Sequence, residues 1–411
     1  MERNHIPLHF LSTRYNHAMK STWFIPILLL AAAALFLSPL FNHPQLPAEG
    51  FSTFGSQTVR AEVTQIIEEG VIDLGGRQQP YQIARVKILE GQYAGVIMEV
   101  DYGKRQVRSD DYHLAPGDQV IVSLSKTPDN TVNAYFVDYV RTQPLTWLLA
   151  AFIISILLIS RWKGFRSLLG MLFSLLVIVE YIIPNILAGE DPLRVSIIGS
   201  VILLGVTLYL TYGWTRKSHA AVLGMILALI LTGLLAGLFV VFARLNGSGD
   251  ENTMFLMQML NTPINLRGLF LGGLIIGALG VLDDLVMTQA SAVFELHQAN
   301  PALGFRGLYD SAMRIGQDHV AATVNTLVLA YAGASLPMFL MFTLGRGDYG
   351  YLVNFAVIAE EIVRTLVGSL GLIAAVPLTT VIAIGFALYA DRLGKLEQFL
   401  GPEGGGEGHV H

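Results

Sequence analysis

Two adjacent carboxylates, Asp283 and Asp284, lie in the segment GVLDDLVMTQASAVFEL, directly after the apolar run GLFLGGLIIGALG. An ionised carboxylate inside a bilayer costs on the order of 3 kcal/mol unless it is paired or protonated. Two adjacent carboxylates also repel each other, so at least one is expected to bind a proton more readily than usual. The pair therefore predicts a proton-carrying site in a membrane. The alternative is a solvated pair that marks the end of a membrane span.

The helical phase of this segment places small residues beside the pair. Gly273, Gly277, Gly280 and Asp284 follow one another at spacings of four, three and four, which puts them on one face of a helix. Small residues on one face allow close helix packing. This face therefore predicts a helix-packing seam that directs Asp284 at a neighbouring helix, with Asp283 about 100° further round.

A buried carboxylate pair needs a counter-charge, and the segment AEEIVRTLVGSLG offers one. Glu360 and Glu361 precede Arg364 by four and three residues, the favourable order for ion pairs on a helix. One interpretation places Arg364 and one glutamate inside the bundle, opposite the aspartates, with an ion pair between Asp284 and Arg364. The other is an outer amphipathic helix held by ordinary surface pairs.

Other polar residues in apolar segments are weaker candidates. Thr323, Asn325 and Thr326 belong to the expected span 320–342 and are expected to be polar positions of the bundle. Glu180 lies near the outer end of its span, where its side chain is expected to reach the interface, and an intramembrane site is the alternative.

The sequence offers little to an enzyme or a metal. His297 and His319 flank a connector and have no third nearby ligand, so a structural or solvated role is expected and metal binding is not. The chain contains no phosphate-binding glycine loop, no nucleophile elbow and no HExxH motif. We expect neither an enzyme nor a bound cofactor.

Composition sets the class of protein. The chain has 411 residues, of which 53% are hydrophobic and 14% charged, and its mean hydropathy is +0.54. Its apolar residues come in runs of roughly 20, the length that crosses a bilayer core. The net charge of −5 is too small to indicate a polyanionic partner, and the lack of cysteine excludes disulfide and thiol chemistry. The sequence predicts an α-helical polytopic membrane protein in contact with the lipid bilayer, with no nucleic-acid partner.

The N-terminal part divides into three segments. Residues 1–22 are basic and are expected in the cytoplasm, and residues 23–41 form an uncleaved transmembrane anchor. Residues 50–141 alternate apolar and polar side chains between turn signals. They predict a small extracytoplasmic all-β domain of five or six strands, an OB-like or similar barrel, with the turn spacing of a meander.

Residues 144–390 predict a multi-helix transmembrane domain. The clusters RWKGFR and TRK mark inner helix ends by the positive-inside rule, and with the anchor the total is about eight spans. The block 351–390 is about 60 Å long if wholly helical, too long for one span, and Pro377 is expected to break it, so one span and a re-entrant helix plus a span both stay open. The tail, 391–411, is expected to be cytoplasmic and partly disordered. The other spans are expected at residues 144–160, 165–187, 193–214, 220–243, from 266 onward, and at 320–342.

Three segments resemble a known family. GVLDDLVMTQASAVFEL, DHVAATVNTLVLAYAGASLP and EEIVRTLVGSLGLIAAVPLT look like the YibE/F family of bacterial membrane proteins, and the resemblance is expected to extend from the β domain to the final helix. This resemblance implies a multi-pass protein of the bacterial plasma membrane. The basic start and the positive-inside rule predict that both termini are cytoplasmic.

A more distant resemblance concerns the order of the elements. It is similar to one half of a resistance-nodulation-division permease, or to the SecD and SecF export subunits, and it implies a proton relay at Asp283 and Asp284. The chain departs from a permease half in having two more spans and a smaller external domain. The lysine of the permease relay belongs to the other half. Arg364 could supply the charge but does not release its proton, and a second copy of the chain could supply the other half.

Two functions follow as hypotheses. The first is a membrane transporter or export factor, coupled to proton flow through the Asp-Asp pair, with an unknown substrate. The second is a scaffold or sensor that does not transport and whose β domain binds an envelope protein.

Overall fold

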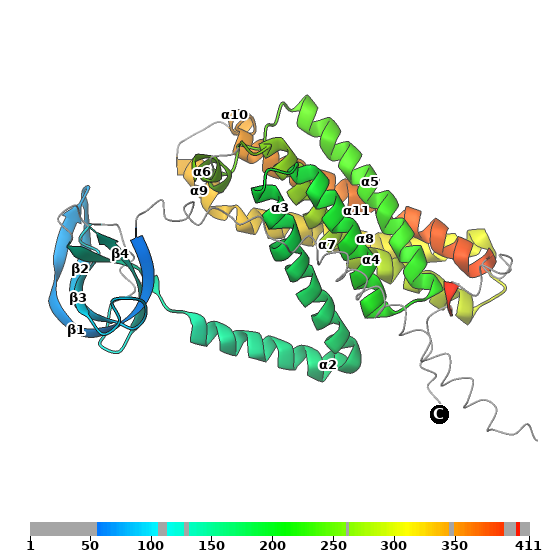
Figure 1. Cartoon of the computed structure of the whole chain (residues 1–411). Helices are drawn as coiled ribbons and strands as arrows, with labels where there is room; N and C mark the ends of the chain where they lie inside the picture. The colour runs from blue at the N-terminus through cyan, green and yellow to red at the C-terminus, as the bar shows by residue number, and fades with distance from the viewer. Residues whose placement is uncertain are drawn as a thin grey trace, which may run out of the picture. The chain divides into compact units, whose positions relative to one another are not determined.

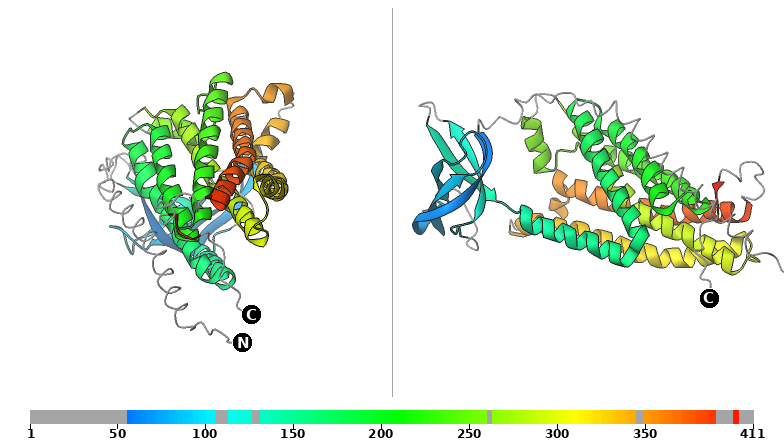
Figure 2. Two further views of the ribbon diagram at one scale, coloured as in Figure 1. Left: turned by 90° about the vertical axis from the view of Figure 1, so that its right-hand side faces the viewer. Right: turned by 60° about the horizontal axis from the view of Figure 1, so that its bottom comes forward.

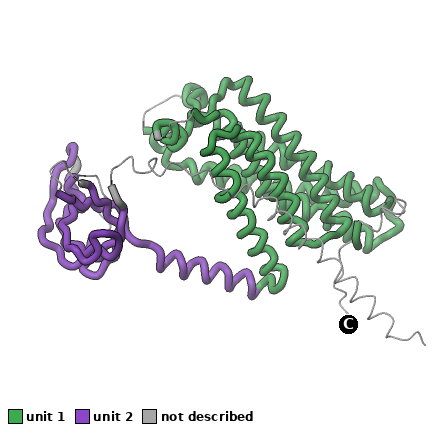
Figure 3. The backbone as a smooth tube through the Cα atoms, viewed as in Figure 1, with its two compact units in different colours: residues 1–44, 159–411 green, residues 45–158 purple. Residues whose placement is uncertain are grey.

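The computed structural model describes residues 56–105, 113–126, 131–259, 263–344, 349–389 and 400–402. The predicted N-terminal segment, the anchor at 23–41 and nearly all of the tail lie outside these residues. The chain divides into two compact units, residues 45–158 and residues 1–44 with 159–411 (Figure 3). We call them the β unit and the helical unit and describe each by itself.

The β unit contains one antiparallel sheet of five strands in the order β3-β2-β1-β4-β5. Alternation of apolar and polar residues produces these strands, since one face of each packs inward. β4 pairs with β1 and not with β3, so the predicted meander is wrong. The strands are β1 (Ser56–Leu74), β2 (Arg77–Ile88), β3 (Ile97–Tyr102), β4 (Gln119–Lys126) and β5 (Val132–Tyr139).

The sheet of the β unit curls so that its two outer strands approach each other. The ring of Tyr102 on β3 meets the ring of Phe136 on β5 edge to face, with centroids 4.9 Å apart. β1 carries two register shifts along its pairing with β2, and such bulges increase the local bend of a strand. The side chains of Val63, Val86 and Val122 are fully buried inside the curl and form its core.

The helical unit packs long apolar helices around α7 and α11, which contact each other (Figures 1 and 2). α7 also contacts α4, α5 and α8, and α11 also contacts α5 and α8. The elements are α2 (Thr142–Leu176, which begins in the β unit), η2 (Val177–Ile182, a π-helix), α3 (Ile183–Leu187), α4 (Pro192–Tyr212), α5 (Arg216–Phe242), α6 (Glu251–Met259), α7 (Leu266–Ala299), α8 (Phe305–Ala334), α9 (Leu336–Leu344), α10 (Tyr349–Leu352) and α11 (Ala356–Tyr389).

Several of these helices are suited to a bilayer. Among the described residues, five helices are long and apolar enough to cross a membrane, or up to six if the bent pair α8 and α9 forms one span. The molecule is thus mostly helical with an N-terminal antiparallel sheet. The total of about eight spans stays a prediction, because the anchor lies outside the described residues.

The first long helical stretch, Thr142–Leu187, contains two irregularities. Its 46 residues would measure about 69 Å as one α-helix, more than twice the bilayer core. The backbone leaves the helical conformation at Arg161, where φ is 47°, inside the cluster RWKGFR. Further on, residues Val177–Ile182 form a π-helix. The stretch therefore accommodates both spans predicted at 144–160 and 165–187.

Two helices differ from the sequence expectation. α11 continues through Pro377, so the predicted break there is wrong. Neighbouring helices stabilise proline inside membrane helices, and α11 packs against α5, α7 and α8. The expected span 320–342 is interrupted instead, because α8 and α9 meet at a bend of 59°.

Basic residues gather at one end of the helical unit. Arg166 on α2 donates to the carbonyl of Thr211 at 3.3 Å, which brings RWKGFR beside Arg216 and Lys217 at the start of α5. We call this the basic end. α4 runs toward it from the opposite end, and so does α7.

At the opposite end, two helix N-caps are linked. Asp191 caps α4 by accepting from the N–H of Arg194 at 3.0 Å, and Asn265 caps α7 by accepting from the N–H of Gly268 at 3.0 Å. The Asn265 amide also donates to Asp191 at 2.9 Å. The N–H of Arg194 and then the amide of Asn265 hold the pKa of Asp191 below its usual value.

Candidate functional site

The two aspartates of α7 lie in different surroundings. Asp283 is half-buried, whereas the side chain of Asp284 is 78% exposed. Asp284 was predicted to face a neighbouring helix, and its exposed side chain lies 4.0 Å from His319 of α8, whereas the aspartate that points inward is Asp283. Consecutive helical residues are about 100° apart, so a helix that buries Leu282, Leu285 and Val286 turns only one of the two inward.

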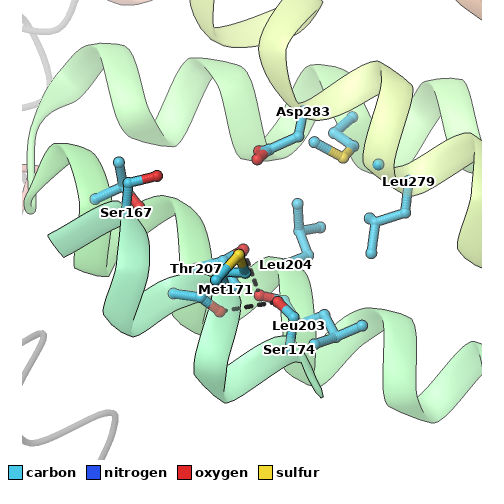
Figure 4. Close-up of a pocket in the computed structure, with 12 residues that line it drawn as sticks. Ser167, Met171, Ser174, Leu203, Leu204, Thr207, Leu279 and Asp283 are labelled. Atoms are coloured by element: carbon cyan, nitrogen blue, oxygen red, sulfur yellow. Dashed lines mark hydrogen bonds between the residues drawn. The ribbon is translucent and has the colours of Figure 1, made fainter. Parts of the chain in front are cut away.

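Asp283 lines a cavity of about 240 Å³ inside the helical unit. Figure 4 shows its carboxylate directed into the cavity, across from Ser174 and Thr207. The walls come from α2, α4, α5 and α7, and they combine hydroxyl groups with apolar side chains. The lining residues are Ser167, Gly170, Met171, Ser174, Leu203, Leu204, Thr207, Thr211, Met225, Leu279, Gly280 and Asp283.

The hydrogen bonds of the cavity wall are unevenly distributed. Ser174 donates to the carbonyl of Gly170 at 2.9 Å, and Thr207 donates to the carbonyl of Leu203 at 2.8 Å. The Oδ1 atom of Asp283 is buried and has no hydrogen-bond partner among the described residues. A buried carboxylate oxygen without a partner is costly, so it indicates a group that binds something from outside the fold.

Asp284 instead lies near residues of the exposed surface. Its Oδ2 atom is 4.0 Å from Nε2 of His319 on α8, and its Oδ1 atom is 3.5 Å from the hydroxyl of Thr288. Both distances are long for an ion pair or a hydrogen bond. Asp284 thus contributes little to the cavity.

Arg364 does not meet the aspartates. Its Nη1 atom donates to Oε2 of Glu361 at 3.0 Å, and its guanidinium lies 5.3 Å from the ring centre of Phe270 on α7. Phe270 precedes Asp283 by thirteen residues, about 20 Å along the helix. The predicted pairing of Asp284 with Arg364 is therefore wrong, and the i, i+3 pair on α11 is what forms.

Glu360 lies at the opposite end of the unit, where it holds a loop. It is 4% exposed, and its Oε1 atom accepts from the N–H of Gly247 at 3.0 Å and of Gly249 at 3.3 Å. The Oε2 atom accepts from Gly249 at 3.3 Å as well. A Cβ on Gly249 would lie 2.8 Å from Oε2, so the glycine is needed for this approach. We call Glu360 with this loop the glutamate cradle.

The predicted helix-packing seam is open. A Cβ on Gly273 or Gly280 would meet nothing within 4 Å, and one on Gly277 would touch only the Tyr331 hydroxyl at 4.0 Å. These glycines are exposed and share the face of Asp284. Close packing occurs at other glycines, where an added Cβ would overlap a side chain of the facing helix: Gly224 with Thr379, Gly272 with Ser196, Gly316 with Val376, and Gly371 with Thr232.

The polar residues predicted on α8 are not gathered around the carboxylates. Thr323 donates to the carbonyl of His319 at 2.8 Å and Thr326 to that of Ala322 at 2.9 Å. Asn325 and Thr326 are exposed, so their placement inside the bundle is wrong.

Two further candidates and one unexpected polar group lie elsewhere. Glu180 is half-buried within η2, and His297 Nδ1 is buried without a hydrogen-bond partner among the described residues. The unexpected group is Gln289, which is 2% exposed and donates to the carbonyl of Ala312 at 3.0 Å and to Thr380 at 2.7 Å. It joins α7, α8 and α11. No cluster of three or more His, Cys, Asp or Glu side chains suited to a metal occurs among the described residues.

The sequence reasoning missed the hydroxyls of the cavity. Ser167 and Ser174 are seven residues apart, and Thr207 and Thr211 are four apart, so each pair lies on one face of an apolar helix. Serine and threonine also occur singly in many membrane helices, where they bond to their own backbone. On each of two helices, two hydroxyl residues share one face, and this spacing was the signal in the sequence that could have indicated a polar cavity.

Comparison with known proteins decides the family. The model of the YibE/F-like protein family matches residues 148–388, more than half of the chain. The chain belongs to the YibE/F-like family. In this YibE/F-like protein the match begins within α2 and ends within α11, so it covers the helical unit and leaves out the sheet. The resemblance expected to start in the β domain is therefore shown only for the helices. No curated protein and no solved structure was found to match the chain.

Proposed function

We propose that this protein is a transporter or export factor of the bacterial plasma membrane, coupled to proton flow through Asp283. The observation that carries the proposal is Asp283, which lines a cavity among helices able to cross a membrane and has one buried oxygen without a partner among the described residues. Intramembrane carboxylates that face a cavity are typical of proton relays and ion pathways. The proposal is of a carrier and not of an enzyme.

The shape of the cavity supports access from one side. Ser167 directly follows Arg166, and Thr211 accepts from Arg166 through its carbonyl, so one part of the cavity lies at the basic end. From there it extends along α2 and α4 over seven to eight residues, about 10 to 12 Å. By the positive-inside rule the basic end is cytoplasmic. We therefore propose that protons reach Asp283 from the cytoplasm in this conformation.

Apolar side chains limit the cavity toward the opposite end. Leu203, Leu204, Met225 and Leu279 line its deep part. Further along the unit, Leu274, Phe270 and Val367 belong to a separate buried apolar cluster. Such a layer excludes water, as a carrier with alternating access requires of its closed side. Protonation would remove the charge of Asp283 and so favour a conformation in which the cavity closes around it.

The β unit supplies the other half of the proposal. The strand order β3-β2-β1-β4-β5, with β3 and β5 brought together, fits an OB-like barrel, a fold that binds extended ligands on its surface. By the positive-inside rule the unit is extracytoplasmic and both termini are cytoplasmic. We propose that it contacts an envelope protein or the transported cargo, and that a second copy of the chain is a further partner.

The test is proton flux in proteoliposomes that contain the full chain. In wild-type proteoliposomes the luminal pH should change as protons flow down an imposed gradient. Asp283→Asn should lower the rate of proton flux at least about tenfold, because the amide cannot carry a proton. Asp284→Asn removes the same charge one residue away and should keep most of the flux. Equal flux in all three proteins, or none in wild type, would count against proton coupling and favour a scaffold.

A further inference from the structure

Two of the hydroxyl groups that line the cavity, those of Ser174 and Thr207, accept and do not donate toward it. A serine or threonine hydroxyl has one hydrogen, and Ser174 and Thr207 each use it on a carbonyl of their own helix. Only oxygen lone pairs of these two side chains remain for the cavity. Asp283 adds a carboxylate with one unpartnered oxygen, an acceptor when ionised. A ligand held by Asp283, Ser174 and Thr207 together must therefore be positive or a hydrogen-bond donor.

The lining residues of the cavity carry no positive charge. None of the twelve lining residues is Lys, Arg or His. Of the ionisable groups nearby, Arg166 on α2 bonds to the Thr211 carbonyl, and His319 on α8 lies beside Asp284 and not beside Asp283. Tyr212 on α4 interacts electrostatically with both aspartates. The ionised carboxylate therefore has no cationic partner among the lining residues.

The size and the atoms of the cavity narrow the ligand class. A volume of 240 Å³ equals about eight water molecules at roughly 30 Å³ each. A small ion would therefore enter with part of its hydration shell. Hydroxyl, carboxylate and water oxygens are hard ligands, which suit hard cations. Met171 and Met225 contribute thioethers, which suit soft cations such as monovalent copper or silver, but they carry no charge.

We propose that the cavity binds a hard monovalent cation, sodium or potassium, at Asp283, with the oxygens of Ser174 and Thr207 on the facing walls. This inference deepens the proposed function, because it names an ion that shares the carboxylate with the proton. A carboxylate that holds a proton loses its negative charge, so the cation and the proton exclude each other there.

The experiment measures thermal unfolding of the full-length protein in detergent at pH 8. Nitrate salts of sodium, potassium and silver are compared with choline nitrate at constant ionic strength. A ligand that binds only the folded state raises the melting midpoint with the logarithm of its concentration. We expect such a rise with sodium or potassium, and its loss as the pH is lowered to 5.

Variants separate the cavity from the rest of the protein. Asp283→Asn should abolish the rise in melting midpoint with sodium or potassium. Thr207→Val removes an oxygen from the cavity wall, so the same rise should require a salt concentration at least about tenfold higher. Thr326→Val is the matched control for Thr207→Val, since Thr326 also bonds to its own helix but lies outside the cavity. Asp284→Asn is the matched control for Asp283→Asn. Both controls should respond like wild type.

Each other outcome overturns the proposal. A rise that persists in Asp283→Asn shows a general salt effect, and a response to silver alone shows a soft-metal site at the thioethers. No response to any salt shows a cavity that takes protons only. The result is independent of transport. A protein that binds sodium but carries no proton flux would contradict the proposed function and support this inference. A protein that carries proton flux but binds neither sodium nor potassium would support the proposed function and contradict this inference.

Discussion

The helical unit holds two inward-facing carboxylates whose surroundings are opposite. Glu360 accepts from two backbone N–H groups in the glutamate cradle and is almost completely buried. Asp283 lines a cavity, and its buried Oδ1 atom has no partner among the described residues. A carboxylate with all its bonds made by the fold stabilises the fold. One with a bond left unmade is placed for a ligand. Glu360 therefore has a structural role, and Asp283 is the candidate for a functional role.

The largest effect is expected at the cradle. Glu360→Ala leaves the N–H groups of Gly247 and Gly249 without an acceptor, at a cost of about 3 kcal/mol in the free energy of unfolding. Glu361→Ala is the control, because it removes a partly exposed pair with Arg364 that is worth about 1 kcal/mol or less. Unfolding in detergent, followed by circular dichroism, measures both. Equal losses would mean that the cradle has no special role.

A somewhat smaller effect separates close-packed from open glycines. Gly224→Val places a side chain against Thr379 of α11, and overpacking of this kind costs about 1 to 3 kcal/mol. Gly273→Val changes the helix propensity by the same amount, but its side chain meets open space. It should therefore lower the stability less than Gly224→Val does. The readout is the fraction of monodisperse protein after heating, by size-exclusion chromatography. A greater loss in Gly273→Val would show that the open face of α7 is covered in the native assembly.

A loss of about 1 kcal/mol is expected at the cap of α4. Asp191→Ala removes the acceptor for the Arg194 N–H. Since the folded pKa of Asp191 is lowered, its contribution is present above the unfolded value of about 3.9 and is lost as the pH falls through the folded value. The difference in melting midpoint between wild type and Asp191→Ala should be constant from pH 7 to 5 and shrink below about pH 4. Asp310→Ala, an exposed aspartate with a 4.0 Å contact, should show neither effect.

The smallest effect is expected at the cavity itself. Asp283→Asn should lower the free energy of unfolding by no more than about 0.5 kcal/mol in choline buffer, because Oδ1 loses no hydrogen bond and the substitution removes an unpaired charge. Glu360→Gln, the equivalent change in the cradle, should cost more, since an amide accepts fewer hydrogen bonds than a carboxylate. If Asp283→Asn proves the more harmful of the two, the division between a structural and a functional carboxylate fails.

Much of the fold was accessible from local patterns. Apolar runs of bilayer length and alternating strands follow from residue types alone, and the cluster RWKGFR coincides with the helix break at Arg161. The break expected at Pro377 was wrong because a proline in a membrane helix can be supported by partners that a local pattern does not reveal. The pairing of β4 with β1 is likewise a long-range property.

The candidate site was predictable only in part. Periodicity placed Asp284 on a face with Gly273 and Gly280, but it could not say whether a neighbouring helix covers that face. Small residues fit both a close contact and an open surface. The cavity around Asp283 needs walls from four helices, so its existence depends on packing that no single segment encodes.

The wall that α2 contributes has a mechanical consequence. It runs between two backbone irregularities, the non-helical residue Arg161 and the π-helix Val177–Ile182. The facing wall, α4, is fastened to α7 by the hydrogen bond between Asp191 and Asn265 and by the close approach at Gly272. A hinge needs residues that absorb backbone rotation, and the wall from α2 has a backbone irregularity at each end. We therefore expect α4 and α7 to move as one rigid body. The stretch of α2 from Trp162 to Leu176 should rotate relative to them, so that this stretch opens and closes the cavity.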